Sequence, residues 1–265
     1  MAESNCVIDL SHHNANVDLA AAKADGIAGI FQKATQGTHH VDPSLPANRR
    51  AASQARLLFG AYHFGTGSDG IEQAEHFLKT VDPGPADLLV LDFEGNPQGP
   101  SMTLEEARVF VTHLREKTGR WPGLYSGHYI KELLQSHSDS VLAKCWFWLA
   151  QYGTTPVVPA NWAGWTFWQY TDGALGPEPH DVAGIGRCDR DKFNGSREEL
   201  FAFWGGAQGN GNIPTTAPVM PEAMVPATSA FSASSTTSSR RSGTIPEMPA
   251  IMMPTEPRLA KPHMA

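Results

Sequence analysis

Residues 88–94 read LLVLDFE, an unbroken apolar run that ends in two carboxylates. Pro85 precedes this run and a Gly-Asn-Pro turn signal follows it, so the segment predicts a fully buried strand. Side chains alternate along a strand, so Asp92 and Glu94 share one side while Phe93 faces the other. Ionised groups are costly at the end of a buried strand, and acid/base chemistry is the usual reason for placing them there.

Outward from this segment, strand-like and helix-like stretches alternate. Strands are expected at residues 6–9, 29–33, 57–64, 88–94 and 123–126, with helices at 17–24, 44–55, 71–81, 103–118 and 129–135. Three further strands are expected at 145–152, 166–170 and 186–189, with no good helix between them, before a closing helix at 196–204. Repeated βα units predict parallel strands, and therefore a barrel or a doubly wound sheet.

The positions of polar residues favour the barrel. Polar residues fall at the carboxyl ends of five expected strands, namely Asp9, Tyr62-His63, Asp92 with Glu94, Tyr125 and Asp189. Barrel enzymes carry their chemistry at that end. No Gly-rich phosphate loop follows the first strand, which weakens the dinucleotide-binding alternative.

Composition divides the chain of 265 residues into two parts. All seven Trp precede residue 205, whereas Pro, Ser, Thr, Ala and Met dominate residues 207–265 without any period. We therefore expect a folded domain at 1–206 and a disordered tail at 207–265. A formal net charge of −7 argues against nucleic acid as the main partner.

Cysteine usage and the amino-terminal segment bear on cofactors and location. Cys6, Cys145 and Cys188 show no metal-ligand spacing, so they are expected to be plain buried thiols, and no metal or other cofactor is expected. The first residues lack a basic region and an apolar core, so no signal peptide is expected and synthesis is expected in the cytoplasm. No apolar run is long enough to predict a membrane span.

Six motifs in order resemble the lysozymes of glycoside hydrolase family 25. They are Ile8-Asp9-Leu10-Ser11, Lys33-Ala34-Thr35-Gln36-Gly37, Gly60-Ala61-Tyr62-His63-Phe64, Leu91-Asp92-Phe93-Glu94, Trp148-Leu149-Ala150-Gln151-Tyr152 and Trp168-Gln169-Tyr170-Thr171. The resemblance implies an irregular TIM-like (β/α)5β3 barrel. It also implies a monomeric muramidase that cleaves the β-1,4 bond between N-acetylmuramic acid and N-acetylglucosamine in peptidoglycan glycan strands. Such an enzyme would reach the wall after membrane breach or by a non-classical export route.

Glycosidic cleavage needs a proton for the leaving oxygen and negative charge beside an oxocarbenium-like centre. Glu94 is the candidate acid, because like charge on Asp92, Asp9 and Asp189 is expected to raise its pKa. Asp92 is expected to remain ionised and to stabilise the transition state or orient the substrate N-acetyl group. Retention and inversion both stay open. The resemblance is imperfect near Asp189, since Asp191 stands where the family usually has Asn.

Five further residues are candidates for substrate binding: Lys33, Tyr62, Tyr125, Trp148 and Tyr170. The two tyrosines at strand ends are expected to hydrogen-bond the sugar, or else to be ordinary core tyrosines. Lys33 is expected to meet a substrate carboxylate or to pair with Asp9. Trp148 suits either a glycan groove or the barrel wall. His63 is expected to be a hydrogen-bonded core histidine.

Two alternatives remain from the sequence. The four acids and His63 could bind a divalent cation in a metal-dependent hydrolase, although no His pair has i, i+4 spacing. A non-catalytic glycan-binding module on the same fold is the second, because fold does not imply activity. Each lone strand-end Asp could also cap a helix or pair with Arg.

Overall fold

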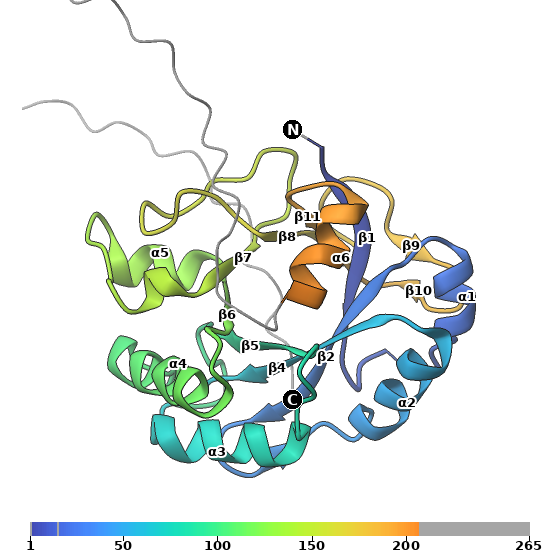
Figure 1. Ribbon diagram of the computed structural model, residues 1–265. Helices are drawn as coiled ribbons and strands as arrows, with labels where there is room; N and C mark the ends of the chain where they lie inside the picture. The colour runs from blue at the N-terminus through green and yellow to red at the C-terminus, as the bar shows by residue number, and fades with distance from the viewer. Residues whose placement is uncertain (1, 15, 207–265) are drawn as a thin grey trace, which may run out of the picture. The chain divides into compact units, whose positions relative to one another are not determined.

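The computed structural model describes residues 2–14 and 16–206, and the predicted tail at 207–265 lies outside them (Figure 1). A closed barrel of eight strands forms its centre. These strands are β1 Ser4–Leu10, β2 Gly29–Gln36, β4 Leu58–Phe64, β5 Leu88–Asp92, β6 Gly123–Ser126, β7 Trp146–Ala150, β8 Phe167–Thr171 and β11 Asp189–Phe193. The predicted (β/α)5β3 barrel is therefore confirmed.

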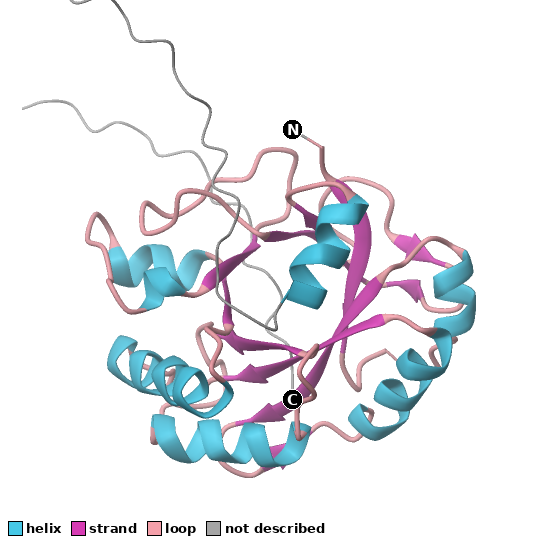
Figure 2. Cartoon of the chain, in the orientation of Figure 1, coloured by secondary structure: helices cyan, strands magenta, loops and turns pink. Residues whose placement is uncertain are grey.

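The helices follow the alternation expected from the sequence. They are α1 Leu19–Ala24, α2 Leu45–Ala55, α3 Gly70–Val81, α4 Leu104–Thr118, α5 His128–Leu134, the 3-10 turn η1 Leu142–Lys144, and α6 Arg197–Gly205. Figure 2 shows the strands as an inner ring with α1 to α5 outside it. Short paired segments complete the fold, namely β3 His40–Val41, β9 Asp181–Val182 and β10 Gly186–Arg187. None of the described helices is long and apolar enough to cross a bilayer.

The barrel closes between its first and last strands. From β1 through β2, β4, β5, β6 and β7 to β8 the neighbouring strands are parallel, whereas β11 is antiparallel to both β8 and β1. Asp189 was predicted to end a strand at 186–189, and this prediction was wrong. It begins β11 instead, after the β9–β10 hairpin. Because β11 runs the opposite way, its first residue still lies at the carboxyl end of the parallel strands, opposite Asp9.

Aromatic side chains fill the barrel interior. The Phe31 ring lies 4.4 Å from Trp148, 5.2 Å from Phe167 and 4.9 Å from Trp204 between ring centroids. Trp204 belongs to α6, and its Nε1 donates a hydrogen bond of 3.0 Å to the carbonyl of Phe59. Helix α6 therefore covers the amino end of the parallel strands, which leaves the opposite end for chemistry.

Candidate active site

A small pocket with almost no accessible surface lies near the carboxyl end of the parallel strands. Its lining residues come from five strands: Asp9, Tyr62, Asp92, Tyr125 and Trp148. All five are buried. Strand register explains why they meet, because Asp92 pairs with Tyr125 and Tyr125 pairs with Trp148 at one level of the barrel. Neighbouring residues at one level of a sheet point to the same face.

Strand β5 ends at Asp92, two residues before the predicted end, although the Phe93 amide still donates to the Tyr125 carbonyl at 2.8 Å. Asp92 is 1% exposed, and its Oδ1 has no hydrogen-bond partner among residues 2–14 and 16–206. Burial and the charge of Glu94 raise the pKa of Asp92 well above its usual range, against an opposing effect of Lys33. Burial and Glu94 thus both disfavour the ionised form of Asp92, an effect that the sequence analysis did not include.

Glu94 does not line the narrow part of the pocket. It is half-buried, and removal of surrounding water raises its pKa to about 7. The sequence had suggested like charge as the cause, whereas burial is the cause in the structure. Glu94 interacts electrostatically with Asp9, Asp92 and Tyr125. A carboxyl of this kind holds a proton near neutrality and still reaches solvent.

Asp9 and Asp189 face each other across the β1–β11 seam. Oδ2 of Asp9 accepts a hydrogen bond of 2.7 Å from Gln169 Nε2. Burial and the charge of Asp191 raise the pKa of Asp9 well above its usual range. The pKa of half-buried Asp189 is raised by burial and then by Asp9. Both carboxyls therefore favour their protonated forms more than free aspartate does.

Gln169 is a site residue that the sequence analysis did not single out. Its amide links two pocket residues, because its Oε1 accepts from the Tyr125 hydroxyl at 2.8 Å while its Nε2 donates to Asp9. The signal was present in the Trp168-Gln169-Tyr170-Thr171 motif, where alternation sets Gln169 on the side opposite the two aromatic residues.

Tyr170 lies on the other side of β8 from Gln169, away from the pocket. Its hydroxyl donates to the Pro179 carbonyl at 2.9 Å and accepts from Asn5 Nδ2 at 2.8 Å. His63 lies in the core, where its ring bonds Thr35 Oγ1 at 2.7 Å and burial lowers its pKa to about 3. His63 is therefore neutral near pH 7, in agreement with the expected core role.

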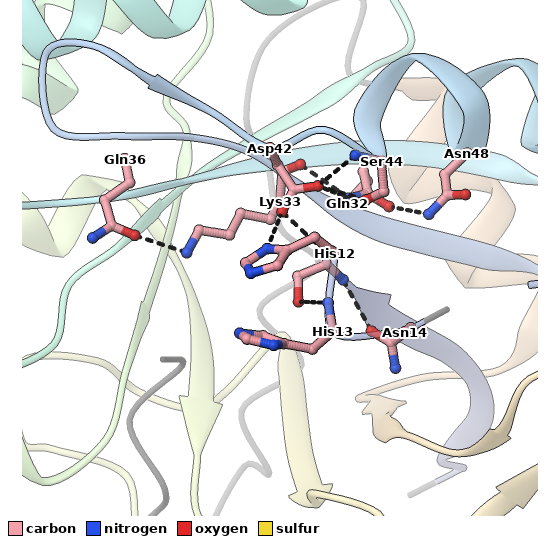
Figure 3. Close-up of polar contacts among 10 residues, drawn as sticks. His12, His13, Asn14, Gln32, Lys33, Gln36, Asp42, Ser44 and Asn48 are labelled. Carbon is pink, nitrogen blue, oxygen red and sulfur yellow. Dashed lines mark hydrogen bonds and ion pairs between the residues drawn. The ribbon is translucent and has the colours of Figure 1, made fainter. Parts of the chain in front are cut away.

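Lys33 is fully buried, and its Nζ donates to Gln36 Oε1 at 2.8 Å (Figure 3). No ion pair joins Lys33 to Asp9 among the described residues. Beside it, Asp42 fixes the loop that follows β1, because its Oδ2 accepts from the His12 amide at 3.0 Å (Figure 3). Oδ1 of Asp42 accepts from the Ser44 amide at 2.9 Å, just before α2. This polar cluster supports the rim of the barrel.

The pocket combines several protonatable carboxyls with aromatic walls. Within residues 2–14 and 16–206, no group of three or more His, Cys, Asp and Glu side chains is arranged to hold a metal ion. The pKa values of Asp9, Asp92, Glu94 and Asp189 are all raised. Such an arrangement suits proton donation to a leaving group more than it suits cation binding.

Comparison with known proteins gives one family. The family model for Glycosyl hydrolases family 25 matches residues 8–177, a range that ends before β11. Lysozyme M1 of Streptomyces globisporus is 33% identical over 211 residues, covering 74% of this chain and 70% of that protein. N,O-diacetylmuramidase of Arthroderma benhamiae is 25% identical over 208 residues, covering 74% and 84%. A crystal structure of the bacterial lysozyme from Streptomyces coelicolor is similar with a TM-score of 0.68 and 31% identity, covering 77% of this chain and 99% of that one.

Proposed function

The chain belongs to glycosyl hydrolases family 25, and we propose that it cleaves the β-1,4 bond between N-acetylmuramic acid and N-acetylglucosamine in peptidoglycan. Family membership makes it a glycosidase of the lysozyme type and a peptidoglycan hydrolase. The bond cleaved and the residues that act on it form the proposal. It rests on the carboxyl groups at the mouth of the barrel.

The observation that carries the proposal is the position of Glu94. Its carboxyl is half-buried and has a pKa of about 7, so near neutrality a large fraction carries a proton. In the proposed reaction Glu94 donates this proton to the glycosidic oxygen as the bond to the anomeric carbon breaks. The resulting carboxylate then removes a proton from the water that completes hydrolysis.

Asp92 supplies the second function in this scheme. Its buried Oδ1, which lacks a partner within the described part of the chain, is an acceptor suited to the N–H of a substrate acetamido group. Held in this way, the acetamido oxygen attacks the anomeric carbon while the leaving oxygen takes the proton of Glu94. Water then opens the cyclic intermediate, so the product keeps the β configuration. NMR observation of the α anomer as first product would exclude this route.

The Glu94→Gln variant tests the proposed acid. Gln keeps the size of the side chain and cannot donate a carboxyl proton, so release of reducing ends from purified peptidoglycan is expected to fall by about 10²- to 10⁴-fold. The matched control is Glu116→Gln, which changes an exposed glutamate on α4. Full activity of Glu94→Gln would overturn the assignment.

Two further measurements separate the competing functions. Mass spectrometry of the products is expected to find muramic acid at the reducing end, whereas glucosamine there would contradict the proposed bond. Loss of activity after chelation would indicate a metal-dependent hydrolase instead. Wall binding by the wild type and by Glu94→Gln, without release of sugar by either, would indicate a glycan-binding module.

A further inference from the structure

Asp191 lies in β11 behind the pocket wall and is 0% exposed. In the register of the sheet it pairs with Gln169 on β8 and with Val7 on β1, while Asp189 pairs with Asp9. Asp9 and Asp191 are therefore diagonal neighbours on one face of the β1–β11 pair, within reach of each other's side chains. Asp191 therefore lies next to Asp9, which lines the pocket, without lining the pocket itself.

The two oxygens of Asp191 have different surroundings. Oδ1 accepts a hydrogen bond of 2.7 Å from Trp148 Nε1, and Trp148 lines the pocket. Oδ2 is buried, and no N–H or O–H donor of the described residues reaches it. A side-chain hydrogen bond also couples Asp191 to the Asp9 carboxyl. Two carboxylates can form that bond only if one of them carries a proton.

Asp9, like Asp191, accepts a hydrogen bond from a neutral side chain. Gln169 Nε2 donates to Oδ2 of Asp9, and Gln169 itself is fixed by the Tyr125 hydroxyl. Each acid of the pair thus receives one conventional hydrogen bond from a neutral donor. The remaining contact lies between the two carboxyl groups. A single proton between the two carboxyls completes a series of hydrogen bonds that runs from Trp148 through Asp191, Asp9 and Gln169 to Tyr125.

We propose that Asp191 is a positioning residue that shares one proton with Asp9, so that the pair carries a single negative charge. The shared proton holds the Asp9 carboxyl at the pocket wall and keeps Asp191 as the acceptor for Trp148. This inference rests on the proposed function, because it assigns Asp191 a part in the same site.

The surroundings disfavour a doubly ionised pair. The charged or titratable groups that interact with the pair are Asp189, Arg190, Glu94, Asp92, Cys188, Tyr62, Tyr125, Tyr152 and Tyr170. The positive charge of Arg190 lowers the pKa of Asp191 and so favours its ionised form. The Arg190 guanidinium also donates a hydrogen bond of 2.7 Å to the Asp181 carbonyl. Complete burial and the carboxyls of Asp189, Glu94 and Asp92 act in the opposite direction. They favour retention of one proton by the pair.

A direct test uses wild-type protein labelled with ¹³C in its aspartate carboxyls. The two signals that disappear or shift in Asp191→Asn belong to the pair. At about pH 6 we expect these signals to report one proton between them and to titrate together. Two fully ionised carboxyls at that pH, or two independent titrations at ordinary aspartate values, would overturn the inference. No substrate enters this experiment, so its result is independent of the proposed function.

Two substitutions test the positioning role. In Asp191→Asn the new amide would accept from Trp148 and donate to Asp9, as a protonated Asp does, whereas the side chain in Asp191→Leu can do neither. We expect Asp191→Leu to lower kcat at least about tenfold and Asp191→Asn to recover most of that loss. Circular dichroism checks that both variants fold. If either variant does not fold, the titration of the labelled wild-type protein tests the shared proton by itself. Equal activity of the Leu variant and the wild type would contradict the role.

The pH dependence separates a shared proton from two ionised acids. In Asp191→Asn the pair still carries one negative charge, so Glu94 senses an unchanged field. The alkaline limb of its rate profile should then shift by less than about 0.3 pH units. A shift toward lower pH of about 0.5 units or more would mean that the substitution removed a charge, and would refute the shared proton. If the wild type released no sugar at all, the proposed function would fail while the labelling result still stood.

Discussion

Asp92 and Glu94 belong to one short segment, yet the barrel removes them from water to different extents. Asp92 is 1% exposed and ends β5 inside the pocket, whereas Glu94 is half-buried two residues further on. This difference divides their work in the proposed reaction. Glu94 can exchange its proton with solvent and substrate, and Asp92 can hold a substrate group within the pocket.

The raised pKa of Glu94 predicts how the rate depends on pH. A general acid must be protonated, so kcat/KM is expected to fall as pH rises through about 7. The measurement is the rate of reducing-end release between about pH 4 and about pH 9. Return of samples from alkaline buffer to the optimum separates titration from unfolding. A rate that continued to climb up to the alkaline end would rule out Glu94 as the acid.

The same carboxyl predicts a pH-dependent effect on stability. Folding raises the pKa of Glu94 from 4.5 to about 7, so its contribution favours the folded state at low pH and is lost as pH rises through about 7. Glu94→Gln has no such loss. It should therefore be more stable than the wild type at about pH 8, on the order of 2 kcal/mol, and similar at about pH 4. Melting temperatures at both pH values, with Glu116→Gln as control, provide the check, and a pH-independent difference would contradict it.

Strand ends in the sequence located much of the pocket. Asp9, Tyr62, Asp92 and Tyr125 were expected there, and the structure brings them together with Trp148. Their catalytic and binding roles stay predictions. The orientation of β8 was harder to anticipate. Alternation separates Gln169 from Trp168 and Tyr170, but it does not show which of the two sets faces the pocket.

At the scale of elements, α6 fixes which end of the barrel remains open. Its buried Trp204 stacks on Phe31 inside the barrel, with ring centroids 4.9 Å apart and an interplanar angle of 28°. The ring also reaches the start of β2, where a Cβ added to Gly29 would approach it to 3.2 Å. The helix thus completes the core and does more than cover it.

Trp204→Ala is accordingly expected to destabilise the fold by about 3–5 kcal/mol, because the substitution leaves a large cavity in the barrel interior. Chemical unfolding monitored by circular dichroism measures the change. Phe201→Ala on the same helix is the matched control, since Phe201 is 41% exposed and its loss should have a small effect. Comparable losses for both variants would show that α6 contributes through its surface and not through this ring.

Periodicity predicted the first five βα units within a few residues, and the Thr103–Glu106 capping box of α4 forms as expected. It failed for β11, whose sequence Asp189-Arg190-Asp191-Lys192-Phe193 carries four charged residues. A strand of this composition is recognisable only after its partners are known, because β1 and β8 bury it on both sides. The two-residue strands β9 and β10 are too short to give any periodic signal.

At the scale of the whole molecule, the pocket and the packing that supports it lie within residues 2–206. We therefore propose residues 1–206 as the catalytic unit. A chain shortened to end at Gly206 is expected to keep the melting temperature and the rate on purified peptidoglycan within about twofold of the full chain. Thermal unfolding and reducing-end release are the measurements. A substantial loss of either would assign residues 207–265 a part in folding or catalysis.

The seam between β1 and β11 joins the beginning of this fold to its end, because Ser4 pairs with Phe193. A ribosome that adds about 5–20 residues per second needs on the order of 10 to 40 s to deliver the second partner after the first. Throughout that interval one edge of β1 has no strand beside it. Its unpaired N–H and C=O groups can then pair with another polypeptide. Closure of the barrel is thus a late event in biosynthesis. The unpaired edge of β1 is where chaperones that bind nascent chains have the longest time to act.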